Sequence, residues 1–220
     1  MFSSAGFTPE ALLVKGVIIA FFLLVAFPVH EFFHAFMAYR LGDGTAKMFG
    51  KLTLNPVAHF HPIGGTMLVL SVLLTGIPLG FAATPVNPSN LRGRYGEAYV
   101  SAAGPISNLL LAAAAAIPFR LLLATDPQLE FELVGRILYL MVWGNVILGL
   151  FNLIPIPPLD GGTILLSLVP RPTAWRLRPI LAQYGFLLLI VIFFVPFGGQ
   201  PLGGRILIPL ANAIYGLLVG

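Results

Sequence analysis

The sequence predicts an all-α membrane protein that crosses the bilayer five or six times and contains one further segment that does not fully cross. Of its 220 residues, 58% are hydrophobic and only 9% are charged, whereas about a quarter of the residues in soluble domains are charged. Several apolar runs reach the length of roughly 20 residues that a helix needs to span a bilayer. We therefore expect a single integral-membrane domain over 1–220, with its core over 11–169 and C-terminal helices within 179–219.

Composition excludes several kinds of chemistry. The chain has no cysteine, so disulfides, thiolate metal ligands and a cysteine nucleophile are excluded, and a bound metal must be held by His, Asp or Glu. The net charge of +4 is small and the basic residues lie in loops, which is typical of topology signals rather than of a nucleic-acid-binding surface. The N-terminal segment lacks the basic region of a cleavable signal peptide, so we expect it to be retained.

The first predicted span, residues 11–36, carries the sequence HEFFH from His30 to His34. Two histidines four positions apart share one face of a helix, about one turn from each other. Both imidazoles can then bind one zinc ion, with Glu31 beside the bound water as general base. Ionisable groups inside a span are costly and usually functional. The pattern predicts a metalloprotease site within the membrane, although the same five letters also occur by chance in proteins that bind no metal.

The next part of the chain alternates polar and apolar stretches. Residues 37–65 form a polar connection, in which the stretch from Lys51 to Pro56 is strand-like. Residues 66–82 are apolar but short, and Gly76 and Pro78 interrupt them. Such a segment fits a re-entrant or β-hairpin-like structure that is buried against protein.

Four more apolar runs complete the predicted spans: 98–123, 133–154, 179–197 and 203–219. If residues 66–82 return to the side they came from, one face of the membrane collects eight basic residues and the other receives the acidic loop from Asp126 to Glu132. Basic loops favour the cytoplasm, so this arrangement predicts an outside N-terminus, five full spans and a cytoplasmic C-terminus. A full crossing of 66–82 would place the basic loops 40–51 and 171–178 on opposite faces.

A third metal ligand can be sought among only eight carboxylates. Four of them fall at the predicted outer face, Glu97 begins a span beside two arginines, and Asp43 lies in a Gly-flanked turn. Asp160 remains, in an apolar surround where three prolines end the preceding helix. Because both spans run inward, Asp160 can meet His30 and His34 in the inner part of the bilayer. We therefore predict these three residues as the metal ligands; the alternative for Asp160 is a helix N-cap.

At these residues the chain resembles the site-2 protease family of intramembrane zinc metalloproteases, in particular its short prokaryotic branch. The matching stretches are HEFFH at 30–34, GKLTLNP at 50–56, PVNP at 85–88, AGPISN at 103–108 and FNLIPIPPLDGG at 151–162. The resemblance implies one zinc ion per chain, held by His30, His34 and Asp160, with Glu31 as the catalytic base. It also implies cleavage within transmembrane helices of other membrane proteins, often to release a membrane-tethered factor.

The chain also departs from longer members of that family. There is no room between Asn108 and Asn152 for their PDZ domain, nor is a C-terminal CBS domain expected, so substrate choice is expected to rest on the substrate's own helix. His61 stands where an acidic residue is expected in relatives. His59 and His61 could form a second metal site or tune a pH response, or they are ordinary loop histidines.

Two asparagines and one extended segment are further candidates for substrate contact. Asn152 precedes the proline break and Asn108 follows a Gly-Pro pair, so either side chain could hydrogen bond to the substrate backbone or to an oxyanion. The alternative for both is hydrogen bonding between helices. Residues 66–82, together with the extended residues 84–88, could offer a strand edge to an unwound substrate helix.

Two other functional classes remain as alternatives. Broken helices and carboxylates at membrane depth also occur in transporters and channels, although no internal repeat is visible here. An inactive relative that only binds membrane proteins is the third hypothesis, which the intact motifs disfavour. The expected partners are the lipid bilayer and transmembrane helices of substrates, with no nucleic acid. The expected location is a prokaryotic plasma membrane, with the active site toward the cytoplasm.

Overall fold

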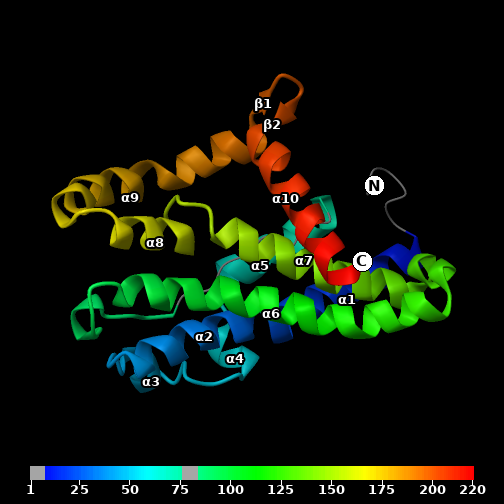
Figure 1. Cartoon of the computed structure of the whole chain (residues 1–220), viewed down its shortest axis with the longest axis horizontal. Coiled ribbons are helices and arrows are strands. Elements are labelled where there is room, and N and C mark those ends of the chain that lie inside the picture. Colours follow the sequence, from blue (N-terminus) through cyan, green and yellow to red (C-terminus); the bar gives the residue numbers. More distant parts are fainter. Residues whose placement is uncertain (1–7, 76–83) are drawn as a thin grey trace.

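The computed structural model describes residues 8–75 and 84–220, and these residues are almost entirely helical (Figure 1). Within them, five helices are long and apolar enough to cross a membrane. They are the continuous helix formed by α1 (Pro9–Phe21), the π-helical turn η1 (Phe22–Ala26) and α2 (Phe27–Arg40), followed by α6 (Gly96–Thr125), α7 (Leu133–Asn152), α9 (Arg171–Phe194) and α10 (Leu202–Val219). The all-α polytopic fold predicted from composition is confirmed.

Shorter elements connect these spans. They are α3 (Thr45–Met48), α4 (Pro56–His59), α5 (Pro62–Thr75), the 3₁₀ turns η2 (Pro88–Asn90) and η3 (Pro127–Phe131), α8 (Asp160–Leu168), and the antiparallel pair β1 (Pro196–Phe197) and β2 (Gln200–Pro201).

The strand-like character expected between Lys51 and Pro56 is wrong. No strand occurs among the described residues between α2 and α6, and this stretch is irregular. Asn55 accepts a hydrogen bond from the Val57 backbone N–H at 3.0 Å, and Pro56 occupies the first helical position. Both features start a helix rather than continue a strand.

The π-helical turn η1 lies directly before the half of the first span that carries the HEFFH sequence. Pro28 has no backbone N–H, so a regular helix would leave a carbonyl without a donor one turn earlier. The helix widens over Phe22–Ala26, where the Phe27 N–H bonds to the Phe22 carbonyl five residues back, as helices commonly do near such sites. The span continues without a break into α2, so the histidines sit on a rigid element.

Helix α5 lies along the first span. Its early residue Gly65 lies against η1, and near its end the Leu73 carbonyl accepts a hydrogen bond from Lys15 Nζ at 3.1 Å. By Thr84 the chain is back beside Glu31. A helix of 14 residues is about 21 Å long, which is less than the roughly 30 Å hydrocarbon core. These contacts favour the re-entrant alternative over a full crossing, although residues 76–82 of the predicted segment lie outside the described residues.

Helices α6 and α7 pack closely at the centre of the bundle. Ala112 and Ala116 of α6 are buried in the same cluster as Val142 and Val146 of α7. Small residues at such a contact let two helix backbones approach closely, which is how membrane helices gain packing energy. This central pair positions the groups that surround the histidines of α2.

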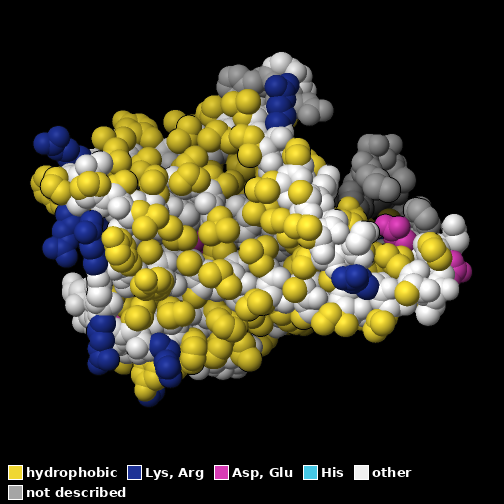
Figure 2. Space-filling model, viewed as in Figure 1, with side chains coloured by type: hydrophobic (Ala, Val, Ile, Leu, Met, Phe, Trp, Pro, Cys, Tyr) yellow, Lys and Arg dark blue, Asp and Glu magenta, His cyan; other side chains and the backbone are white. Residues whose placement is uncertain are grey.

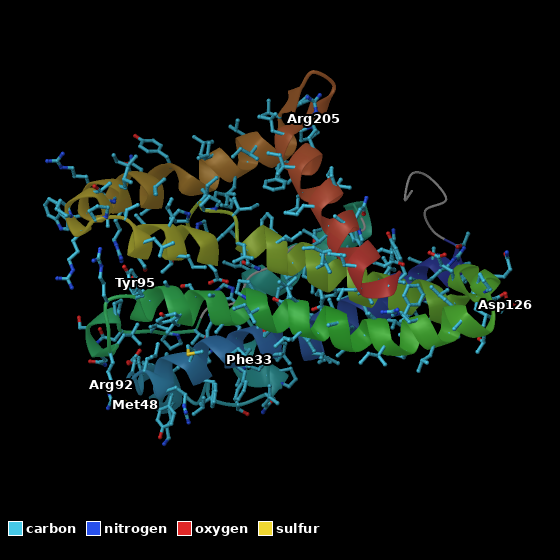
Figure 3. The ribbon with its side chains drawn as sticks, in the orientation of Figure 1. Phe33, Met48, Arg92, Tyr95, Asp126 and Arg205 are labelled. Atoms are coloured by element: carbon cyan, nitrogen blue, oxygen red, sulfur yellow. The ribbon has the colours of Figure 1, made fainter. Side chains whose placement is uncertain are left out.

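Charged side chains separate toward the two ends of the bundle. Figure 2 shows most Lys and Arg at the end that carries α3 and the start of α9, with the visible acidic side chains at the opposite end. Arg92 lies at the first end and Asp126 at the other (Figure 3). At the basic end Arg178 pairs with Glu97 at 3.0 Å. The separation agrees with the predicted division of loops between two membrane faces.

The last two helices differ from the prediction of a C-terminus at the basic end. Near the end of α9, Phe193 packs on Phe151, which is close to the basic end of α7. Near the end of α10, Tyr215 packs on Phe119 and Tyr139, with ring centroids 6.5 and 5.3 Å apart, in the half of the bundle toward the acidic end. Helix α9 packs mainly on α8 and α10, and α10 continues from there toward the acidic end (Figure 1).

Candidate metal centre

Three side chains predicted as metal ligands meet at one point. Nε2 of His30 and Nε2 of His34 lie 3.0 Å apart, and Asp160 Oδ2 lies 3.2 and 3.4 Å from them. Both histidines project from α2, while Asp160 is the first residue of α8. Among residues 8–75 and 84–220 they form the only group of three His, Asp or Glu residues arranged to hold a metal ion.

The spacing of these atoms suits a tetrahedral ion. Ligand bonds of about 2.0–2.1 Å at a tetrahedral zinc ion would separate its ligand atoms by about 3.3 Å, close to the three distances above. Asp160 Oδ2 is buried and has no hydrogen-bond donor within the described residues. The N-cap alternative for Asp160 fails, because Leu159 is the cap and α8 has no side-chain capping bond. The donor set therefore fits a metal ion.

The hydrogen bond at Nδ1 of His34 determines which ring nitrogen carries the hydrogen. Nδ1 lies 2.7 Å from the backbone carbonyl of Val100 in α6, and that carbonyl can only accept. Nδ1 therefore carries the hydrogen, and the neutral ring presents a bare lone pair at Nε2. A hydrogen bond of this kind is the usual support for a metal-binding histidine.

A chain of buried amides fixes His30 in the same way. The Met141 carbonyl accepts from Asn145 Nδ2 at 2.8 Å, which sets the orientation of that amide. Asn145 Oδ1 accepts from Asn108 Nδ2 at 3.3 Å, so Asn108 Oδ1 faces His30 Nδ1 at 2.6 Å and accepts its hydrogen. Both asparagines are fully buried. The chain links α7, α6 and α2 and leaves Nε2 of His30 unprotonated in the neutral ring.

The electrostatics of these three acceptor atoms favour a bound cation. Two imidazole lone pairs and a carboxylate oxygen lie 3.0 to 3.4 Å from one another. The side chains of His30 and His34 are almost inaccessible to water. Acceptors brought together in a medium of low dielectric constant repel strongly unless positive charge lies between them. A metal ion supplies that charge without protonating either ring.

Gly104 of α6 forms the floor of the site. A Cβ atom on this residue would lie 2.3 Å from His34 Nε2 and 2.7 Å from His30 Cε1. Only glycine lets α6 approach the two rings so closely. Gly104, the glycine of the Gly-Pro pair, therefore leaves space for the two histidine rings.

Glu31 lies beside the metal ligands but not among them. Its side chain is buried, at 4% exposure, and its Oε2 accepts a hydrogen bond from Thr84 Oγ1 at 2.7 Å. Thr84 also approaches the Glu31 backbone carbonyl at 3.1 Å. The sequence prediction named Glu31 but missed Thr84, because 53 residues separate them and no local pattern joins them.

The two asparagine predictions have different outcomes. Asn108 does not face a substrate: it is fully buried, and both ends of its amide are bound within the protein. Of the two alternatives for Asn108, the structure has hydrogen bonds between helices. Asn152 donates to the Leu148 carbonyl of its own helix at 3.0 Å. A substrate role for Asn152 stays a prediction.

The loop histidines lie apart from the candidate metal centre. His59 Nε2 lies 2.7 Å from the Thr53 carbonyl, and His61 Nδ1 accepts from the Gly64 backbone N–H at 3.2 Å. Neither belongs to a group of three metal-ligating residues among those the structure describes. The His59 bond ties the end of α4 to the loop before it, and the His61 bond lies at the start of α5.

Comparison with known proteins found a matching family model and several similar proteins. The model of peptidase family M50 matches residues 121–192, which include Asp160. A Bacillus subtilis protein named "Putative zinc metalloprotease YwhC" is 37% identical over 198 residues, covering 87% of this chain and 84% of that protein. A Mycobacterium tuberculosis protein named "Putative zinc metalloprotease Rip2" is 34% identical over 199 residues, covering 87% of this chain and 73% of that protein.

A second protein of the latter name, from Mycolicibacterium smegmatis, is 33% identical over 174 residues, covering 79% of this chain and 65% of its own length. No solved structure matches the chain. The family match and the extent of the first two similarities, together with the geometry of the three ligands, lead to one conclusion: the chain belongs to peptidase family M50, the site-2 protease family.

Proposed function

We propose that this protein is an intramembrane zinc metalloprotease that hydrolyses peptide bonds within or near the transmembrane helices of other membrane proteins. The observation that carries the proposal is the convergence of three acceptor atoms, from His30, His34 and Asp160, beside the buried carboxylate of Glu31. Two of these ligands and Glu31 lie in a helix long and apolar enough to span a membrane. The printed names of the similar proteins, zinc metalloproteases, support the same activity.

His30, His34 and Asp160 would hold one zinc ion per chain. Zinc bound by three protein ligands activates a water molecule as nucleophile and polarises the carbonyl that is attacked. The protein's part is to keep the ligands deprotonated and oriented. The Val100 carbonyl and the Asn108 amide do this by accepting the Nδ1 hydrogens of the two rings.

Glu31 is the proposed general base and acid. Its carboxylate takes a proton from the attacking water as the new carbon–oxygen bond forms at the scissile carbonyl. The same carboxyl then gives that proton to the amine nitrogen as the carbon–nitrogen bond breaks, so the carboxylate is regenerated. The burial of Glu31 in the same helical turn as His30 and His34 supports this role.

A cavity at the basic end supports access of water to this site. It has a volume of about 500 Å³ and lies between the first turn of α6, α8 and the start of α9, where Glu97, Ser167 and Arg178 line it. Glu97 and Ser167 are each seven residues, about 10 Å along a helix, from Gly104 and Asp160 respectively. Hydrolysis at membrane depth needs such a polar route.

The same features support an orientation in the membrane and a substrate class. The basic end is proposed to face the cytoplasm of a prokaryotic plasma membrane, because basic loops stay inside. A substrate helix must unwind before its peptide bond can be attacked, since its carbonyls are already hydrogen bonded. Residues 84–87 have no regular structure and begin beside Glu31, which supports pairing of an unwound substrate along them.

The proposal is tested with purified protein in detergent and a panel of single-span helical substrates. We expect cleavage at sites that mass spectrometry maps inside the hydrophobic span, loss of cleavage with a zinc chelator, and recovery when zinc is added back. Matched peptides that keep the polar flanks but lack the span serve as controls and should remain intact. Zinc binding without cleavage of any substrate would instead favour the transporter or inactive-relative alternative.

Asn108→Ala is expected to weaken zinc binding by about 10- to 100-fold, because it removes the acceptor that orients His30. The measurement is competition for zinc against a chelator of known affinity. Asn212→Ala is the matched control, since the Asn212 amide accepts from Trp143 in a contact remote from the ligands. Equal zinc affinity in Asn108→Ala and wild type would show that the amide chain does not support the metal.

A further inference from the structure

We infer that Thr84 is a positioning residue for the Glu31 carboxylate and that Asp43 anchors the segment that carries Thr84. The inference rests on the proposed role of Glu31 as base. We call residues 84–92 the Thr84 segment; it joins the region after α5 to the start of α6. Neither Thr84 nor Asp43 belongs to the motifs from which the function was predicted.

The first step is the contact between Thr84 and Glu31. A hydroxyl has one hydrogen to donate, and the shorter of the two Thr84 contacts, 2.7 Å, is with the carboxylate oxygen Oε2. Hydrogen bonds to a carboxylate are among the stronger ones in proteins. This bond restrains the rotation of a side chain that must meet a water molecule, and it leaves the second carboxylate oxygen to take the proton.

The second step is the anchor at the other end of α2. Asp43 is fully buried, and its carboxylate accepts four hydrogen bonds. The backbone N–H and hydroxyl of Thr45 donate to Oδ1 at 3.1 and 2.5 Å. The Asn90 amide donates to Oδ1 at 3.1 Å, and the Asn87 backbone N–H donates to Oδ2 at 2.7 Å.

The two donors from the Thr84 segment distinguish Asp43 from ordinary turn chemistry. An Asp in a turn normally bonds to the backbone two residues later, which the bond from Thr45 satisfies. Asn87 and Asn90 come from 44 and 47 residues along the chain. The carboxylate therefore links the end of the helix that carries Glu31 to the segment that carries Thr84.

Backbone contacts strengthen the same link. The Arg92 N–H donates to the Leu41 carbonyl at 2.8 Å. Gly42, at φ +107°, lies under the Asn90 carbonyl, where a Cβ would be only 3.2 Å from that oxygen. Figure 3 shows Arg92 at the end of the molecule where α2 stops and α3 begins. The Thr84 segment is thus fixed at Asp43 and again at Leu41.

The charge of Asp43 is stabilised by its donors. Burial alone would raise the pKa of this carboxyl, but the hydrogen bonds from Thr45, Asn87 and Asn90 outweigh it and hold the pKa below its ordinary value. Asp43 is accordingly an anion at neutral pH, and its bonds to the Thr84 segment are charge-assisted. An amide at this position could not accept at all four places.

Thr84→Val and Thr84→Ser test the first step. Valine keeps the shape but removes the hydroxyl, so kcat for a single-span substrate is expected to fall about tenfold, as for a small misplacement of a catalytic group. KM and the zinc content are expected to stay at wild-type values, because the ligands are unchanged and a substrate paired along residues 84–87 would bond to backbone groups that valine keeps. Serine restores the hydroxyl and should recover most of kcat. Thr125→Val, at an exposed threonine near the acidic end, is the matched control.

Asp43→Asn tests the second step through a double-mutant cycle with Thr84→Val. If Asp43 acts through Thr84, its substitution lowers kcat in the wild-type background but has little further effect when Thr84 is already valine. Asp126→Asn is the matched control, because Asp126 also accepts a bond from the backbone two residues later but lies at the other end (Figure 3). Equal effects of Asp43→Asn in both backgrounds would overturn the anchoring role.

The outcomes separate this inference from the proposed function. Wild-type cleavage that Glu31→Gln abolishes, with full activity in Thr84→Val, would overturn the positioning role alone. A loss of zinc in Thr84→Val, or no rescue by serine, would also overturn it, since the effect would then be a general disturbance of the site. Absence of cleavage by the wild type would overturn the proposed function and this inference with it.

Discussion

Glu31→Gln is expected to abolish peptide-bond cleavage while the protein still binds one zinc ion. Glutamine has the shape of glutamate and can still accept the hydrogen bond from Thr84. It cannot take a proton from water at any working pH, and general base catalysis contributes about 10²–10⁴-fold to such reactions. His30, His34 and Asp160 are unchanged, so the metal site should form normally.

The experiment compares zinc content, by atomic absorption, with cleavage of the same helical substrate. Glu130→Gln is the control, because Glu130 lies in η3, beyond the outer end of α6 and away from the ligands. Wild-type zinc with no cleavage in Glu31→Gln alone would identify the base. Activity that survives this substitution would mean that another group takes the proton, and the role given to Glu31 would be abandoned.

The spans and the convergence of His30, His34 and Asp160 could be predicted because each rests on a strong constraint in the sequence. Apolar runs of about 20 residues have few alternatives to a membrane helix. The i, i+4 spacing puts His30 and His34 on one face of any helix. Asp160 followed by elimination, since a chain with eight carboxylates offers few buried candidates. In each case the prediction needed no knowledge of how the helices pack.

The supporting groups could not be predicted, because their partners are set by packing. For Asn108 the sequence left open a substrate contact or a bond between helices; the approach of α7 brings Asn145 to it and turns its oxygen toward His30. Nothing in the sequence around Asn145 distinguishes it from a residue that merely bonds its own helix. Asp43 looked like a turn residue and is one, yet its partners in the Thr84 segment come from more than 40 residues away.

The placement of α10 failed for a related reason. The positive-inside rule assigns loops to faces but assumes that every apolar helix crosses the bilayer beside its predecessor. Helix α9 leaves most of its surface uncovered and leans on α8, so the helix that follows it begins near Phe151 rather than at the acidic end. Hydropathy and charge do not predict the tilt of α9, because that tilt depends on which helix packs against it.

Gly104→Ala is expected to eliminate zinc binding and, with it, cleavage. The added methyl group would lie 2.3 Å from His34 Nε2, well inside contact distance. The rings cannot simply turn aside, because the Val100 carbonyl and the Asn108 amide hold their Nδ1 atoms at 2.7 and 2.6 Å. One ligand must therefore leave its position, and a site of three ligands that loses one no longer holds zinc tightly.

Gly16→Ala separates this effect from a general effect of alanine. Gly16 also lies within a helix, but a Cβ there would meet nothing within 4 Å. Alanine is the better helix former by about 1 kcal/mol, so Gly16→Ala should keep or gain helix stability with unchanged zinc affinity, and only Gly104→Ala should lose the metal. Zinc affinity measured by chelator competition distinguishes them. Wild-type affinity in Gly104→Ala would mean that α6 can move away from the rings, and the close approach of this helix would then have no part in forming the site.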